Sequence, residues 1–205
     1  MIDVMTDGAL TVITLNRADK ANALNAQMLQ DLADAVEDAQ DAQALILTGA
    51  GKVFSAGMDL EAAKSGLATS PVWERLSGAL AAFPGLSIAA LNGTVAGGAM
   101  GMVLACDLRI SVPGAKVFYP VMKLGFLPQP SDPMRLAQLI GPARAKLILM
   151  GGQKVTVEEA HGFGLIDEIV THGDVLARAR DLSADTLAAA SAHARAIKAF
   201  FQSPR

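Results

Sequence analysis

The spacing of hydrophobic and polar positions divides the chain into segments typical of strands and helices. Residues Val4 to Leu15 alternate as one or two strands do, and Ala44 to Thr48 form an apolar run typical of a buried strand. Between these two segments, Asn25 is placed to cap a helix. The apolar face of that helix consists of Met28, Leu29, Leu32, Ala35 and Val36. Repetition of strand, turn and helix predicts a layered α/β fold.

A long segment without any charged residue, Leu76 to Cys106, exceeds the roughly 20 residues of a membrane-spanning helix. Proline and glycine residues interrupt it, which favours several buried elements over one membrane span. The expected elements are a helix at Pro71–Phe83, a strand at Ser87–Leu91, the Asn92–Gly93 turn and a helix that starts near Ala99. We therefore expect neither a membrane span nor a signal peptide.

The second half of the chain is predicted to be mainly helical. A stiff loop with three prolines, LPQPSDP at Leu127 to Pro133, precedes it. Helices are expected at Met134–Ile140, at Ala143–Met150, after the capping box of Thr156 and Glu159, and from about Val175 to Phe201.

Composition narrows the class of protein. With 205 residues, of which 52% are hydrophobic and 18% charged, the chain fits one globular domain with a sizeable core. A net charge of −3 and a pI near 5.6 give no basic surface for nucleic acid. Cys106, the single cysteine, lies in an apolar run, so we expect a core residue in a reducing cytoplasm rather than a nucleophile.

Two glycine-bearing stretches carry the clearest chemistry, FSAGMDL at Phe54–Leu60 and NGTVAGGAMGMVLACD at Asn92–Asp107. The first N–H groups of a helix have no partner within the helix and lie at the positive end of its dipole. The N–H of Gly98 therefore suits an oxyanion, and no Cβ keeps a substrate away. Met58 supplies a second N–H, so the two stretches predict a two-donor site for the anion of a thioester. The alternative is that Gly97 and Gly98 only let a helix pack closely on a strand.

Further motifs extend over almost the whole chain. They are ITLNRADKANALN at Ile13–Asn25, ALILTGAGKVFSAGMDL at Ala44–Leu60, SIAALNGTVAGGAMGMVLACDLRIS at Ser87–Ser111 and MRLAQLIGPARAKLILMGGQKVTVEEAHGFGLIDEIV at Met134–Val170. Together these motifs resemble the crotonase superfamily, the enoyl-CoA hydratase and isomerase proteins. The resemblance implies a spiral of repeated β-β-α units in residues 1–140. A shortened C-terminal helical region, residues 141–205, would belong to the same single domain.

The same resemblance indicates which catalytic groups are missing. Hydratases of this family use two glutamates, one to deprotonate water and one to pass a proton to the α-carbon. Their positions fall on Gly101 and Val121, neither of which transfers a proton. Standard two-glutamate hydration, and isomerisation by the second glutamate, are therefore disfavoured. In the aryl-CoA dehalogenase branch the first glutamate is also a glycine, but the positions of its histidine and aspartate fall on Glu74 and Gln129, so dehalogenation is poorly supported.

Three side chains remain as candidates for the chemistry. Glu74, on the helix expected to cover the acyl pocket, would act as a lone base, and the alternative is a solvated helix carboxylate. Asp132 would reach the pocket from the proline-containing loop, and the alternative is a turn or helix cap. Tyr119, the single tyrosine, would donate a hydrogen bond near the usual site, and the alternative is core packing.

The resemblance places the contacts with coenzyme A on two loops and beside the oxyanion site. The expected residues are Lys20, Ala21, Ala23, Ala56, Met58, Asp59, Leu60 and Gly98. Lys64 lies near the second loop, but Ala21 stands where a basic residue is common, and a solubilising role is an equal alternative for both lysines. Asp59 is expected to hold the loop that presents Met58.

No metal site or permanently bound cofactor is expected. The three histidines, His161, His172 and His193, show no ligand spacing with one another or with Cys106. We assign all three to structural or surface roles.

The leading functional hypothesis is a cytoplasmic enzyme that acts on an acyl-CoA thioester, in the manner of the lyases and isomerases of fatty acid metabolism. Its step would be isomerisation, hydrolysis or decarboxylation, with Glu74 or Asp132 as proton carrier. The alternative is a non-catalytic protein that binds acyl-CoA or serves as a regulatory or assembly subunit; a purely structural module is a third. The resemblance also implies a homotrimer or hexamer.

Overall fold

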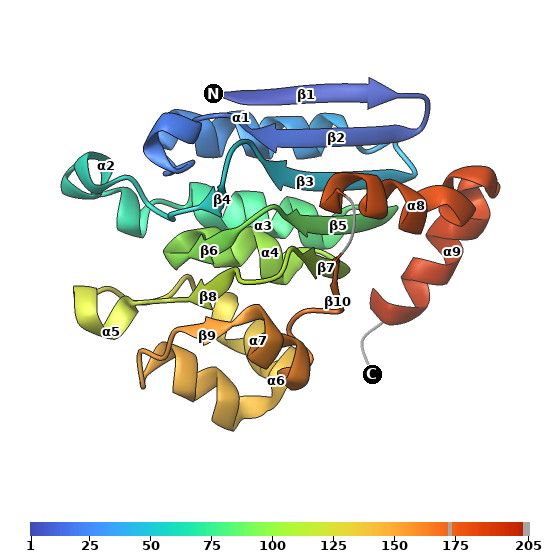
Figure 1. The fold of residues 1–205 in the computed structure, drawn as a ribbon. Coiled ribbons are helices and arrows are strands. Elements are labelled where there is room, and N and C mark those ends of the chain that lie inside the picture. Colours follow the sequence, from blue (N-terminus) through green and yellow to red (C-terminus); the bar gives the residue numbers. More distant parts are fainter. Residues whose placement is uncertain (172–173, 203–205) are drawn as a thin grey trace.

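The computed structural model describes residues 1–171 and 174–202, and within them the strands form two sheets (Figure 1). The six-stranded sheet has the order β1 (Ile2–Asp7), β2 (Leu10–Leu15), β3 (Ala44–Gly49), β5 (Leu86–Leu91), β7 (Leu108–Ser111) and β10 (Glu168–Ile169). The four-stranded sheet has the order β4 (Val53–Ser55), β6 (Thr94–Ala96), β8 (Lys116–Phe118) and β9 (Val155–Thr156).

The path of the chain between the two sheets makes a spiral. Each of the pairs β3–β4, β5–β6 and β7–β8 gives one strand to each sheet and then leads into helices. The pairings between β2, β3, β5 and β7 and between β4, β6 and β8 are parallel, whereas β1 joins β2 as an antiparallel hairpin. This arrangement confirms the expected α/β spiral of repeated β-β-α units.

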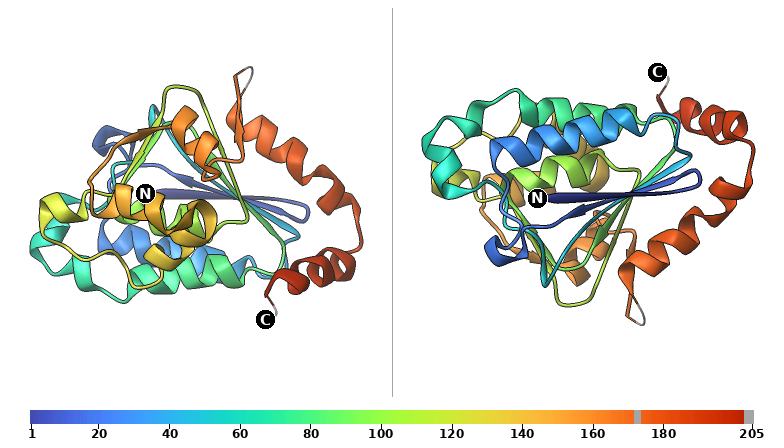
Figure 2. Two further views of the ribbon diagram at one scale, coloured as in Figure 1. Left: turned by 90° about the horizontal axis from the view of Figure 1, so that it is seen from below. Right: turned by 90° about the horizontal axis from the view of Figure 1, so that it is seen from above.

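Helices cover both faces of the six-stranded sheet (Figure 2). The helices are α1 (Ala26–Asp38), α2 (Leu60–Lys64), α3 (Val72–Ala82), α4 (Met100–Ala105), α5 (Val121–Leu124), α6 (Asp132–Leu149), α7 (Val157–Phe163), α8 (Val175–Ala188) and α9 (Ser191–Gln202). Helices α1, α3 and α4 enclose the larger core on one face, and α8 covers a second apolar cluster on the other. Burial on both faces explains why β3 and β5 are almost continuously apolar.

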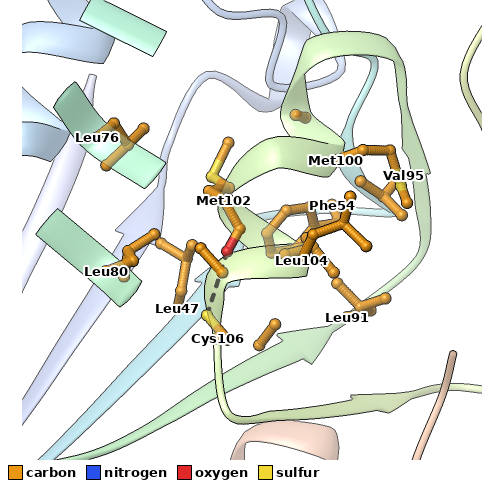
Figure 3. Packing of buried hydrophobic residues seen from close by; sticks show 14 of the residues in the cluster. Leu47, Phe54, Leu76, Leu80, Leu91, Val95, Met100, Met102, Leu104 and Cys106 are labelled. Carbon is orange, nitrogen blue, oxygen red and sulfur yellow. Dashed lines mark hydrogen bonds between the residues drawn. The ribbon is translucent and has the colours of Figure 1, made fainter. Parts of the chain in front are cut away.

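The stretch without charges forms part of the larger core. All six residues of α4 are buried, and Met100, Met102 and Leu104 lie among side chains of α3 and the neighbouring strands (Figure 3). No helix in the described part of the chain is long and apolar enough to cross a membrane. Cys106 is buried, its thiol donates to the carbonyl oxygen of Met102 (3.3 Å), and burial raises its pKa to about 12, which confirms a core residue.

Local capping signals locate several helices correctly. The Asn25 side chain accepts a hydrogen bond from the N–H of Met28 at 2.9 Å, and Thr156 with Glu159 forms the expected capping box. Helix α6 is interrupted at Gly141 (φ 80°, ψ 157°), which separates the two helices expected there. It begins at Asp132, slightly before the expected start, because Pro133 is tolerated in the first turn.

One prediction about element boundaries is wrong. The last helix is broken, because Ala189 is extended (φ −77°, ψ 162°), and α9 turns back onto the body of the protein. Arg195 donates to the carbonyl oxygen of Gln40 (2.7 Å), and Lys198 donates to that of Gly85 (2.7 Å). Alanine favours helix everywhere, so an alanine-rich pattern cannot reveal such a break. The Asn92–Gly93 turn leads into the short strand β6, which was not predicted, and α4 then begins at Met100, close to the expected start near Ala99. Within residues 141–202, β9 and β10 add one strand to each sheet.

Candidate functional site

A cleft of about 150 Å³ is lined in part by residues of α2 and α5. These two helices lie at the same end of the molecule (Figure 1). Its walls are mainly apolar and come from the two glycine-bearing stretches, from α2 and from the segment around α5. Its lining includes Ala56, Met58, Leu60, Trp73, Gly97, Gly98, Tyr119, Val121, Leu127 and Gln129. A larger hollow of about 580 Å³ lies between β1 and α1, but four aspartates line it and would repel phosphate groups.

The N–H of Met58 points away from the chain segment that holds it. Leu24 forms a parallel bridge to Met58, in which Leu24 donates to the carbonyl oxygen of Gly57 (2.7 Å) and accepts from the N–H of Asp59 (2.8 Å). Adjacent peptide groups of an extended segment face opposite ways. The N–H of Met58 therefore faces the other side, and it takes part in no turn, loop or cap hydrogen bond of the described residues.

The N–H of Gly98 is the second N–H group that the sequence predicts to bind an anion. Gly98 is the middle residue of a 3₁₀ turn, Gly97–Ala99, that leads directly into α4. At this position the N–H has no partner within the turn, and none of the turn, loop or cap hydrogen bonds in the described residues uses it. Both Met58 and Gly98 line the cleft, as the sequence motifs predict.

The two donor loops touch each other through glycine backbone. Gly57 has a φ of 89°, and a Cβ on it would lie 2.6 Å from the carbonyl oxygen of Ala96 and 3.3 Å from the Cα of Gly97. A Cβ on Gly97 (φ 57°) would in turn lie 3.7 Å from the Cα of Gly57. Only glycine allows this approach at these dihedral angles. The contact fixes the relative position of the two donors.

The reason expected for a glycine at position 98 needs correction. A Cβ on Gly98 would lie 3.0 Å from two atoms of the Trp73 ring. The space left by the missing side chain is therefore filled by the edge of the Trp73 ring, not held open for a substrate. Trp73 is 4% exposed, and its indole N–H donates to the carbonyl oxygen of Leu67 (2.8 Å), so it is a fixed wall of the cleft. No sequence motif indicated Trp73 as part of the site.

Asp59 makes structural contacts that hold the loop of Met58. Its carboxylate caps α2 by accepting from the N–H of Glu61 (2.9 Å), and it forms an ion pair with Arg17. The hydrogen bond from Arg17 is the main reason why the pKa of Asp59 lies below its ordinary value. Arg17 also donates to the carbonyl oxygen of Ala23 (2.9 Å). Asp59 does not line the cleft.

A residue that the sequence analysis missed, Asn22, joins these loops. It is fully buried and adopts a positive φ of 53°. Its side chain donates to the carbonyl oxygens of Ala50 (2.9 Å) and Val53 (2.8 Å) and accepts from the N–H of Arg17 (2.9 Å). Asparagine tolerates this backbone region better than most residues, and its amide satisfies several groups at once.

The other positions expected to contact coenzyme A divide into two groups. Ala56 and Leu60 line the cleft together with the two donors. Lys20, Ala21 and Ala23 lie outside the cleft lining, although Ala21 accepts a hydrogen bond from the N–H of Ala56 (2.9 Å) and so supports that loop. Lys20 and Lys64 are exposed, and Lys64 pairs with Glu61 at 2.9 Å.

The two positions at which the resemblance places the catalytic glutamates have different surroundings. Val121 is buried and lines the cleft. Gly101 lies in α4, and a Cβ on it would lie 3.0 Å from Oδ1 and 3.3 Å from Oδ2 of Asp132. The carboxyl group of Asp132, carried by α6, therefore approaches the backbone position from which a side chain at Gly101 would start.

Asp132 and Tyr119, which the sequence analysis treated separately, are directly bonded. The Tyr119 hydroxyl donates to Oδ2 of Asp132 at 2.9 Å and lies 3.4 Å from the N–H of Gln129, which donates to it. Tyr119 lines the cleft, whereas Asp132 is 0% exposed behind it. Burial is the main cause that raises the pKa of Asp132 to about 6, and it also raises the pKa of Tyr119 well above its ordinary value.

Glu74 is linked to the start of α6 rather than to the cleft. Its carboxylate accepts from the N–H of Ser131 (3.1 Å) and from the Ser131 hydroxyl (3.0 Å), and it does not line the cleft. Glu74, Asp132 and Tyr119 therefore lie close to one another, but of these three residues only Tyr119 lines the cleft.

The histidines form no site within the described residues. His161 lies on α7, with Nδ1 2.8 Å from the carbonyl oxygen of Ile166, and His193 lies on α9. His172 falls outside the described residues. In residues 1–171 and 174–202, no group of three or more His, Cys, Asp or Glu side chains is arranged to hold a metal ion.

A β-β-α spiral with a cleft that offers two backbone N–H groups defines a protein of the crotonase class. The sequence profile of the enoyl-CoA hydratase/isomerase family matches residues 5–204, so the chain belongs to this family.

Individual relatives agree with this assignment. YngF of Bacillus subtilis is 35% identical over 148 residues, which are 69% of this chain and 57% of YngF. Carnitinyl-CoA dehydratase of Salmonella arizonae is 34% identical over 167 residues, 78% of this chain and 63% of the relative. The chain thus spans less than two thirds of either relative. The solved structure of Pseudomonas aeruginosa DspI is 31% identical, with a TM-score of 0.90 over 98% of this chain and 80% of DspI.

Proposed function

We propose that this protein binds an acyl-CoA thioester in the cleft and stabilises the oxyanion of its enolate through the N–H groups of Met58 and Gly98. The observation that carries the proposal is the pair of N–H groups for which the described residues supply no hydrogen-bond partner, held together by the close approach of Gly57 and Ala96. A single donor of this kind typically contributes roughly 2.7–4 kcal/mol to the stabilisation of a transition state. Relatives that are named for CoA thioesters, such as the carnitinyl-CoA dehydratase, support this choice of ligand.

The walls of the cleft favour an apolar acyl group. Leu60 and Leu127 line the cleft and are 75% and 87% exposed, so they present apolar surface at its mouth. An aliphatic chain would cover that surface and remove it from water. Lys20 and Lys64, both exposed, would attract the phosphates of coenzyme A from outside the cleft.

The proposed chemistry belongs to the hydratase/isomerase type but does not follow the two-glutamate scheme. Gly101 and Val121 offer no proton carrier, so a single carrier would have to serve, with Asp132 or Glu74 as the candidates. The same absence supports the alternative of a non-catalytic acyl-CoA-binding or regulatory subunit. A cytoplasmic location, a role in fatty acid metabolism and an assembly of three or six copies complete the proposal, and sedimentation would test the assembly.

Calorimetry with octanoyl-CoA, with free coenzyme A as the reference ligand, tests the binding. We expect octanoyl-CoA to bind more tightly than coenzyme A, because the thioester carbonyl and the acyl chain add contacts. Equal affinity for both ligands, or no binding of either, would contradict the proposal.

Replacement of Met58 by proline tests the donor itself. Proline removes the N–H of position 58 but leaves the two hydrogen bonds of Leu24, which use Gly57 and Asp59. Met58→Leu, which keeps the N–H and a similar volume, is the matched control. We expect M58P to slow exchange of the α-protons of octanoyl-CoA with deuterated water by about 100-fold or more. M58L should stay close to the wild type, and equal rates in both variants would exclude a role for this N–H.

A further inference from the structure

We propose that Tyr119 and Asp132 form a proton relay that takes the place of the carboxylate missing at Gly101, with Tyr119 as the group that meets the substrate. This inference rests on the proposed function, because it assigns a proton carrier to the same cleft. It makes Tyr119 the catalytic residue and Asp132 a positioning residue that accepts the proton through Tyr119.

The geometry has the two parts that such a relay needs. The Tyr119 hydroxyl donates a hydrogen bond to Oδ2 of Asp132 and accepts a hydrogen bond from the N–H of Gln129. A phenol oxygen has two lone pairs, so one remains for a proton from the cleft side. The ring is held in place by burial, since Tyr119 is 4% exposed.

The position of Asp132 is costly for folding alone and calls for another explanation. Its carboxyl group is fully buried, and Oδ1 has no hydrogen-bond partner among the described residues. A buried acceptor without a partner is unfavourable. The room for this group exists because position 101 is glycine, since a Cβ there would lie 3.0 Å from Oδ1.

The charges around Asp132 keep its proton affinity in a useful range. Its pKa is raised to about 6, because burial and, to a smaller extent, Glu74 on α3 raise it more than Tyr119 and Arg135 lower it. Helix α4, which contacts it through Gly101, contributes no charged side chain. Asp132 is therefore mostly ionised at pH 7 yet more basic than an exposed aspartate, as a general base should be.

The chemical step balances without an additional reactant. The α-carbon–hydrogen bond of the thioester breaks, its electron pair forms the enolate, and the negative oxygen is held by the two N–H groups. The proton moves to the oxygen of Tyr119 while the phenol proton moves to Asp132. Return of the proton to the α-carbon gives exchange, and return to the γ-carbon of an enoyl thioester gives a shift of the double bond. One relay is sufficient for isomerisation, whereas hydration needs a second group to deliver water.

Tyr119→Phe and Asp132→Asn test the relay, because each removes one proton-transfer group and keeps the shape. We expect both variants to exchange the α-protons of octanoyl-CoA in deuterated water at least about 100-fold more slowly, measured by mass spectrometry. Octanoyl-CoA affinity should change less than threefold. Asp107→Asn, which alters a partly buried carboxylate bonded to Ser87 and Lys198 outside the cleft, is the control and should exchange normally.

The pH profile gives a readout that a merely structural role would not change. The wild-type rate should rise about tenfold per pH unit below pH 6 and level off above it, because only ionised Asp132 accepts the proton. D132N should lose this rise. If either variant fails to fold by circular dichroism, the wild-type profile decides alone, and a profile without the rise overturns the relay.

The outcomes separate the relay from the proposed function. No binding of octanoyl-CoA overturns both. Binding without exchange, or loss of exchange in only one of the two variants or in neither, overturns the relay and leaves acyl-CoA binding in place.

Discussion

The cleft has two halves that are built in different ways. The proposed oxyanion half consists of backbone N–H groups, and their positions depend on a close approach of the two loops, since a Cβ on Gly57 would lie 2.6 Å from the carbonyl oxygen of Ala96. The proposed proton-transfer half consists of side chains, and both of its expected glutamate positions hold other residues. A site made from backbone N–H groups changes only if the conformation of its loops changes. A site made from side chains can lose a functional group through one substitution, and a side chain from a neighbouring helix or strand can take its place.

The structure gives this difference a physical basis. Gly57 and Gly97 both have positive φ angles and pack against each other, so a side chain at either position strains the backbone. At Gly101 the neighbour within reach is instead the carboxyl group of Asp132. The empty space at Gly101 and the buried carboxyl group are thus complementary.

Gly57→Ala gives the largest effect we expect and would break the oxyanion half. The new methyl would lie 2.6 Å from the carbonyl oxygen of Ala96, at a φ of 89° that L-residues avoid. We expect a loss of about 2–5 kcal/mol in the free energy of unfolding, measured by urea denaturation, together with loss of octanoyl-CoA binding. Gly66→Ala is the matched control, because Gly66 has a φ of 81° but no atom within 4 Å of the Cβ position.

In G66A the free energy of unfolding should fall by only about 1 kcal/mol, which is the cost of the unfavourable dihedral angle. This variant should bind octanoyl-CoA normally. Equal losses of stability in G57A and G66A would mean that the contact between the two donor loops contributes nothing. The comparison between the two halves would then lose its structural basis.

Asp132→Asn sharpens the comparison from the proton-transfer half, because it should raise stability while it lowers activity. The pKa of Asp132 is about 6 in the folded protein against an ordinary value of 3.8, so the folded state binds this proton more tightly. Stability therefore falls as the pH rises from about 4 to about 6, and the full penalty remains at higher pH.

Removal of the charge should raise the free energy of unfolding by up to about 3 kcal/mol at pH 8, but by only about 0.5 kcal/mol at pH 4. Urea denaturation of wild type and D132N at the two pH values measures this. A gain of the same size at both values would show that the effect does not come from the ionised carboxyl group. A lower free energy of unfolding for D132N at pH 8 would mean that the carboxylate stabilises the fold. Its burial would then need no functional explanation.

The amino-acid sequence predicted those parts of the fold that depend on local contacts. Asn25 as a helix cap, the break at Gly141 and the capping box at Thr156 follow from residues within one turn of each other. The strands β6, β9 and β10 have two or three residues each and form through distant pairings, so no local pattern indicates them. The break at Ala189 likewise accompanies contacts of α9 with remote segments.

The candidate site shows the same division. The motifs around Met58 and Gly98 were sufficient to predict that both line one cleft. Tyr119 and Asp132 each had a structural alternative that the sequence could not exclude, because their bond depends on how α6 packs beside α4. The sequence named both residues as candidates, but the glycine at position 101 pointed only to a missing group and not to Asp132, which approaches the same place.

Lys20→Ala and Lys64→Ala give the smallest effects and test whether charge outside the cleft belongs to the site. Both side chains are exposed, so we expect changes under about 0.5 kcal/mol in the free energy of unfolding. Octanoyl-CoA affinity should fall about two- to fivefold at low ionic strength, and the difference should vanish at high salt, because screening weakens attraction between exposed charges and phosphates. Lys146→Ala, on the exposed side of α6, is the control and should leave the affinity unchanged. A salt-independent loss in the K20A or K64A variant would instead indicate a direct contact with the ligand.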